Sequence, residues 1–178
     1  MRRHTTTDSP VGPLTLVEHD GALAGLYLHE QRHLPNASAF GVRDDGVLPE
    51  ARAQLAAYFD GTLRQFDLPL APGGTPFQQQ VWAALREVPY GSTCTYAELA
   101  AAVGRPTAVR AVGAANGRNP ICLVVPCHRV VGTDGALTGY AGGLERKAFL
   151  LALEAGATPS GPTPRAGQRR RPGPPTPP

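Results

Sequence analysis

The pattern of apolar and polar positions predicts an antiparallel hairpin near the start of the chain. Two apolar runs, residues 14–18 and 23–28, have the length of strands, and Asp20-Gly21 lies between them. Asp-Gly is a strong hairpin signal because both residues tolerate a positive φ. Residues 49–59 then show helical spacing, and Gly61 follows as a stop. The apolar positions of this helix fall on one side: Leu55, Tyr58 and Phe59.

A second helix is predicted after the Pro-Gly segment at residues 71–74, which we interpret as a linker. Thr75 can cap it, Pro76 suits the first helical position, and Gln78 completes a capping box. The helix should end before Pro89. Its apolar face is formed by Phe77, Val81, Trp82 and Leu85, so we expect Trp82 in the core.

A pair of short helices is predicted next, joined by a tight glycine turn. Thr95 with Glu98 forms a second capping box before a helix over 96–103, and Thr107 is expected to cap another helix over 108–115. Two short helices joined in this way resemble a helix-turn-helix, whose second helix would lie against DNA. Many globular proteins contain such a pair, so the pattern alone leaves DNA contact open.

Candidate chemistry follows an apolar run at residues 121–125, which predicts a short buried strand ended by Pro126. Cys127, His128 and Arg129 come directly after it. A free cysteine has a pKa of about 8.5, so a nucleophilic thiol needs a nearby base or positive charge. His128 and Arg129 could supply both, although core packing beside a surface imidazole is the alternative interpretation.

Composition and charge change this picture only slightly. The chain has 178 residues and is 42% apolar, enough for one large or two small domains with a sizeable core. The net charge of +3 comes from four arginines in residues 158–178, which leave 13 basic against 14 acidic residues elsewhere. Residues 92–131 nevertheless carry four arginines against Glu98 alone, a local basic patch suited to DNA.

Several classes of protein are not supported by the sequence. Three cysteines without C-x-x-C spacing argue against a disulfide framework and a cysteine-rich zinc site. The histidines before residue 34 are scattered, so we expect no metal. There is no secretory signal and no membrane-spanning run, which favours a cytoplasmic protein. Residues 158–178 are rich in proline and arginine, and we expect them to be disordered.

The segment from Asn119 to Val130 resembles the active-site signature of the O6-alkylguanine-DNA alkyltransferases, also called methylated-DNA–protein-cysteine methyltransferases. The resemblance runs from Thr75 to about Gly156 and includes further ordered blocks. These blocks are Val81-Trp82, Pro89-Tyr90-Gly91, Thr95-Tyr96, Arg110-Ala111-Val112-Gly113, Gly139-Tyr140 and Gly142-Gly143-Leu144.

The resemblance implies an α+β fold in two small domains. An N-terminal domain with an antiparallel sheet would occupy residues 1–74, and a mainly helical domain with the helix-turn-helix and the active-site cysteine would occupy residues 75–157. The implied activity is repair of duplex DNA by direct reversal. A methyl or other alkyl group would move irreversibly from O6 of guanine to Cys127, in a single turnover without a cofactor. The protein would act as a monomer, and repair of O4-alkylthymine stays open.

The resemblance also implies roles for individual residues. The catalytic candidates are Cys127, His128, Glu154, Tyr96 and Asn119: Glu154 would orient His128, which would take the thiol proton through a water molecule. Tyr96 would contact the extruded guanine and donate to it, and Asn119 would brace the helix-turn-helix against the active-site loop. A glutamate near a helix C-terminus is unfavourable against the macrodipole, so its presence there suggests a stabilising partner such as an imidazole.

Further residues are expected at the substrate and at the DNA. The substrate candidates are Tyr96, Arg129, Val130, Tyr140 and Lys147, with Tyr140 walling the alkyl pocket. The DNA candidates are Thr95, Arg105, Arg110 and Ala111. In the family the second helix enters the minor groove, and the residue matching Arg110 fills the stack vacated by the flipped base, since a paired base must be extruded before O6 is reached.

Three other functions compete with this interpretation. A noncatalytic module that recognises the damaged base would lack the cysteine, which this chain retains. A thiol hydrolase using Cys127, His128 and Glu154 would turn over an ester or amide. A plain helix-turn-helix regulator would not explain the thiol.

Overall fold

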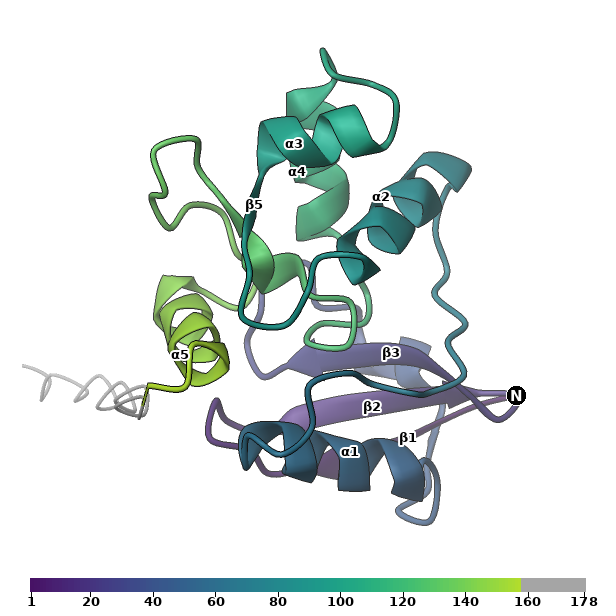
Figure 1. Cartoon of the computed structure of the whole chain (residues 1–178). Helices are drawn as coiled ribbons and strands as arrows, with labels where there is room; N and C mark the ends of the chain where they lie inside the picture. The colour runs from purple at the N-terminus through teal and green to yellow at the C-terminus, as the bar shows by residue number, and fades with distance from the viewer. Residues whose placement is uncertain (158–178) are drawn as a thin grey trace, which may run out of the picture.

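A four-stranded sheet forms the N-terminal half of the computed structural model, which describes residues 1–157 (Figure 1). The strand order is β3-β2-β1-β4. The predicted hairpin is confirmed: β2 and β3 pair antiparallel, and both turn residues have positive φ, Asp20 at 51° and Gly21 at 83°. The disorder expected for residues 158–178 concerns residues outside the described part. The strands are β1 (Arg2–Thr7), β2 (Leu14–His19), β3 (Ala22–Leu28) and β4 (Val42–Arg43).

Two strands of this sheet were not predicted from the sequence. β1 reads Arg-Arg-His-Thr-Thr-Thr, and Thr5 is its one fully buried residue, so it carries no apolar alternation. It forms because it pairs antiparallel with β2 along its whole length. β4 is two residues long and pairs parallel with β1, so the sheet is not entirely antiparallel. A 3₁₀ turn, η1 (Ala37–Phe40), precedes β4.

The helix expected over residues 49–59 is present as α1 (Pro49–Phe59), which lies alongside the sheet (Figure 1). Leu55 and Tyr58 are buried, as the spacing predicts, and Phe59 is half-buried. Gly61 follows the helix with φ at 74°, a conformation that glycine adopts without steric cost.

The C-terminal half is mainly helical, and both predicted capping boxes are confirmed at Thr75 and Thr95. Trp82 is buried in the core, and its indole N–H donates to the carbonyl of Ala115 at 2.9 Å. The predicted Thr107 cap is wrong. The N-cap is Ala108, without a side-chain hydrogen bond, since a backbone turn from Arg105 leads into the helix. The helices are α2 (Pro76–Arg86), α3 (Tyr96–Ala102), α4 (Val109–Gly117) and α5 (Leu144–Glu154).

The strand predicted over residues 121–125 is also wrong, because this segment folds into a tight buried turn. Ile121 makes a single bridge to Leu26 of β3. Leu123 then adopts φ at 70°, and the Val125 N–H donates to the Ile121 carbonyl at 3.0 Å. All five residues are buried, as the apolar run predicted. The strand was wrong because a short apolar run does not by itself distinguish a strand from another buried element.

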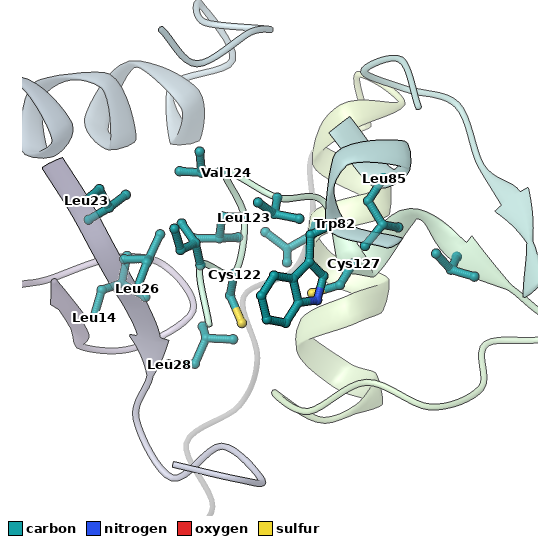
Figure 2. Close-up of a cluster of buried hydrophobic side chains, with 14 of the residues drawn as sticks. Leu14, Leu23, Leu26, Leu28, Trp82, Leu85, Cys122, Leu123, Val124 and Cys127 are labelled. Atoms are coloured by element: carbon teal, nitrogen blue, oxygen red, sulfur yellow. The ribbon is translucent and has the colours of Figure 1, made fainter. Parts of the chain in front are cut away.

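This turn joins the two halves into one core. Leu14, Leu23, Leu26 and Leu28 of the sheet face Leu123 and Val124 of the turn, and Trp82 and Leu85 of α2 belong to the same core on the other side (Figure 2). Beyond the turn come η2 (Cys127–Arg129) and β6 (Val130–Val131), which pairs parallel with β5 (Cys94–Thr95). Within residues 1–157, no helix is long and apolar enough to cross a membrane.

Candidate active site

The Cys127 thiol lies at the start of η2, buried in the core that joins the two halves (Figure 2). Pro126 directs the chain into this position, and the Cys127 N–H donates to the Val125 carbonyl at 2.8 Å. The pKa of Cys127 is below its ordinary value, chiefly because the Cys122 side chain donates a hydrogen bond to it; burial opposes this effect. Asn119 and the charge of Lys147 lower it further. The site therefore favours the thiolate, the nucleophilic form.

His128, the next residue, is fully buried and oriented by Glu154. Its Nε2 lies 2.7 Å from Oε1 of Glu154. An ionised carboxylate only accepts hydrogen bonds, so Nε2 carries the proton and Nδ1 keeps its lone pair. Burial lowers the pKa of His128 below its ordinary value despite the opposing influence of Glu154. The imidazole is therefore neutral and able to accept a proton at Nδ1.

The Glu154 carboxylate, the last residue of α5, is the centre of the polar cluster. Burial acts to raise its pKa, but hydrogen bonds and charge from His128 and Arg129 outweigh burial and hold the pKa at about 2. Oε1 also accepts from the Tyr58 hydroxyl at 2.7 Å, and Oε2 accepts from the Gly91 N–H at 3.2 Å. These partners supply the reason for placing a glutamate at a helix C-terminus.

Arg129 is placed at this carboxylate. Its Nε donates to Oε2 of Glu154 at 2.8 Å and its Nη2 to Oε1 at 3.0 Å. Its Nη1 donates to the Val88 carbonyl at 2.6 Å, and the guanidinium lies over the Tyr90 ring. Arg129 therefore anchors Glu154, and its expected contact with the substrate stays a prediction.

Lys147 and Val130 are buried residues that hold the backbone next to the site. Lys147 is fully buried, and its Nζ donates to the carbonyls of Val130 and Thr138, the latter at 2.6 Å. Burial lowers the pKa of Lys147. The Val130 side chain is buried in the core. These contacts tie β6 to the loop that carries Tyr140, and the expected substrate contacts of Lys147 and Val130 stay predictions.

Two buried asparagines hold the backbone around Cys127. Asn119 donates from Nδ2 to the Val125 carbonyl at 2.8 Å and accepts the Ile121 N–H at 3.0 Å, so it closes the turn that leads to the thiol. Asn116, at the buried face of α4, donates to the Cys127 carbonyl at 3.4 Å. Sequence reasoning missed Asn116. The available signal was a polar residue next to the buried position 115 of an alanine-rich helix.

A cavity of about 490 Å³ lies between α3, α4 and the loop at 138–141. Tyr96 and Tyr140 both line it. The Tyr96 hydroxyl donates to the Gly139 carbonyl at 3.0 Å, and the Tyr140 hydroxyl is buried with no hydrogen-bond partner among the described residues. Arg32 and His33 of the N-terminal half also line the cavity, which the sequence did not indicate.

The candidate DNA residues lie on the outer side of the helix pair. Arg110 and Ala111 are exposed on α4, as expected for a helix face that approaches a groove. Arg105 is exposed in the turn between α3 and α4 and lies over the Phe77 ring. Thr95 caps α3, accepting the Glu98 N–H at 3.1 Å. Its side chain is therefore already engaged in the helix start.

Comparison with known proteins agrees with this geometry. Residues 76–156 match the family described as 6-O-methylguanine DNA methyltransferase, DNA binding domain, and residues 2–72 match its ribonuclease-like domain. A methylated-DNA–protein-cysteine methyltransferase of Mycobacterium tuberculosis is 49% identical over 160 residues, covering 90% of this chain and 96% of the relative. The constitutive enzyme of Bacillus subtilis is 46% identical, covering 86% and 96%.

Solved structures are as similar to this chain as these sequence relatives are. The crystal structure of Mycobacterium tuberculosis OGT in complex with DNA has a TM-score of 0.83 and 49% identity, covering 89% of this chain and 96% of that one. The match includes both the sheet half and the helical half, and it accords with the α+β architecture described above. Two family matches together spanning most of the sequence, and relatives near half identity, lead to one conclusion: this chain belongs to the 6-O-methylguanine DNA methyltransferase family.

Proposed function

We propose that this protein repairs duplex DNA by moving an alkyl group from O6 of guanine to Sγ of Cys127, and that each molecule acts once. Family membership carries the reaction class. The observation that supports the residue assignment is the buried pair of His128 and Glu154 at 2.7 Å, where His128 follows in sequence a cysteine whose pKa is lowered. Such a pair orients a base towards a nucleophile.

The reaction proceeds as a displacement at carbon. The proton of Cys127 passes through a water molecule to Nδ1 of His128, and Glu154 stabilises the imidazolium that forms. The thiolate attacks the alkyl carbon, a C–S bond forms, and the bond from carbon to O6 breaks with its electron pair on guanine. Tyr96, which lines the cavity, donates a hydrogen bond or proton to the leaving base in place of the Gly139 carbonyl. No cofactor is needed because the thiol is itself the acceptor.

Binding of the duplex is assigned to the exposed face of α4. Ala111 and Ala114 are small and exposed, which permits close approach to the minor groove. Arg110, also exposed, fills the space that the extruded guanine leaves. The cavity beside Tyr96 and Tyr140 receives the flipped base. We also propose that the protein acts as a monomer in the cytoplasm, on DNA that contains O6-alkylguanine.

A duplex carrying labelled O6-methylguanine tests this function. Label should move to the protein in a one-to-one ratio, and intact-mass analysis should place a single methyl on Cys127. Exhaustive chelation should leave the transfer unchanged, since no metal takes part. Continued release of product beyond one equivalent would contradict single turnover and would favour a thiol hydrolase, whereas binding without transfer would favour a noncatalytic recognition module.

A further inference from the structure

Tyr58 extends from the sheet half of the molecule to the acid–base pair of the helical half. It lies on α1, is 1% exposed, and is separated from Glu154 by 96 residues in the sequence. Its hydroxyl donates to Oε1 of Glu154 at 2.7 Å, the same distance as His128 Nε2 to that oxygen. The hydroxyl stays protonated because burial, and then the Glu154 charge, raise the pKa of Tyr58 well above its ordinary value.

We infer that Tyr58 is a positioning residue for alkyl transfer, through which the N-terminal half sets the orientation and the basicity of His128. The inference rests on the proposed function, because it assigns His128 the role of base. It gives the sheet half a part in the chemical step, although none of the reacting atoms lies there.

The hydrogen bonds to Glu154 show how this works. Oε2 is held by Arg129 and by the Gly91 N–H, both from the helical half. Oε1 receives three donors, from His128, Tyr58 and Arg129, which exceeds the two lone pairs of one oxygen. Tyr58 therefore competes with His128 for the same electron density. Without the hydroxyl, Oε1 would bind the His128 N–H more strongly and stabilise the imidazolium.

Packing alone does not account for a tyrosine at this position. The ring is surrounded by Phe59, Phe66 and Tyr90, with ring centroids 5.3 to 6.1 Å away. A phenylalanine would fill the same volume without burying a hydroxyl, and a buried hydroxyl is costly unless it is hydrogen-bonded. The hydroxyl is retained in an aromatic cluster, and its partner there is the Glu154 carboxylate.

The test is Tyr58→Phe, which keeps the ring and removes only the donor. Single-turnover transfer from free O6-benzylguanine is measured across pH, so that DNA binding plays no part. We expect the acid limb of the profile to move to higher pH by about half a unit or more, because His128 becomes more basic. The matched control is Tyr27→Phe, which removes a tyrosine hydroxyl on β3 that is not among the donors to Glu154 and should leave the profile unchanged.

A titration of the His128 ring by NMR provides a second measurement that does not depend on transfer. The pKa of His128 should be higher in Tyr58→Phe than in the parent protein. A parental pH profile and a parental His128 pKa in Tyr58→Phe would overturn the inference, even if the melting temperature fell. Failure of the parent protein to methylate Cys127 would instead reject the proposed function, so the two failures are distinguishable.

Discussion

Each half of the molecule buries one ionised carboxylate, and the two carboxylates differ in what their partners can do. Glu18 on β2 accepts a hydrogen bond from Arg3 at 3.0 Å and another from the Gly21 N–H, and chiefly the latter lowers its pKa. Glu154 accepts from Arg129 and a backbone N–H in the same way, but also from His128. Only the second set contains a group that changes its protonation state near neutral pH.

The difference shows that a buried, ionised carboxylate is not by itself a sign of catalysis. Glu18 joins the hairpin turn to the first strand, and neither partner, the Arg3 guanidinium or the Gly21 N–H, changes its protonation state at physiological pH. Glu154 is likewise held by an arginine and a backbone N–H, but it also orients the His128 imidazole, which follows the Cys127 thiol in the sequence. The functional carboxylate is recognised by the titratable partner it orients, and substitutions in the two halves can separate these roles.

The largest effect is expected at the thiol. Cys127→Ala should abolish transfer to the protein while lesion binding is retained, because no acceptor remains. Cys122→Ala should retain transfer, because Cys122 is not the acceptor, but transfer should be slower and the protein less stable, because a buried side chain that lowers the pKa of Cys127 is lost. Intact-mass analysis after incubation with methylated duplex distinguishes these outcomes. Methyl on Cys94 or Cys122 of the parent protein would contradict the assignment.

The next effect tests the comparison of the two carboxylates directly. Glu154→Gln should slow transfer by about 10²- to 10⁴-fold, the usual contribution of an oriented base, because His128 loses its negative partner. Glu18→Gln changes the same atom at a similarly buried position and should cost stability without slowing transfer at saturating substrate. Single-turnover rates and thermal melts on both variants provide the check. Equal rate losses would show that Glu154 has no catalytic role that Glu18 lacks.

Acid should destabilise the protein through Glu154. Its pKa is about 2 in the folded state and near 4.5 when unfolded, so its contribution is fully present above about pH 4.5 and is lost as the pH falls towards 2. The shift corresponds to about 3 kcal/mol. The lowered pKa of His128 acts in the same direction from about pH 6.5 downward. Urea unfolding at several pH values should show a smaller acid loss in Glu154→Gln, and identical acid losses would contradict this.

The smallest expected effect concerns an exposed charge. Arg110 is exposed on α4, whereas Arg129 is bound inside the protein. Arg110→Ala should therefore leave stability and reaction with free O6-benzylguanine unchanged, and slow repair of duplex about tenfold or more because only the duplex requires base extrusion. Parallel rates on the two substrates provide the measurement. Equal losses on both would reject the role in extrusion.

Much of the local structure was determined by the sequence alone, because its signals act over a few residues. The Asp20-Gly21 turn and the capping boxes at Thr75 and Thr95 satisfy backbone groups within their own segments, so they formed where the sequence predicted them. The pairing of His128 with Glu154 was expected through the family resemblance. The turn and the two capping boxes each have one favourable solution that does not depend on distant residues, whereas the His128–Glu154 pair, 26 residues apart, was expected only through the resemblance.

Tertiary structure decided what depends on partners far along the chain. β1 has no apolar pattern and exists through its pairing with β2, and residues 121–125 turn because the core on both sides and the Asn119 side chain take up their backbone groups. The same holds at the site, where Arg129 is drawn to Glu154 and Tyr58 reaches it across 96 residues. Contacts at such separation leave no periodicity in the sequence, because packing rather than local propensity selects them.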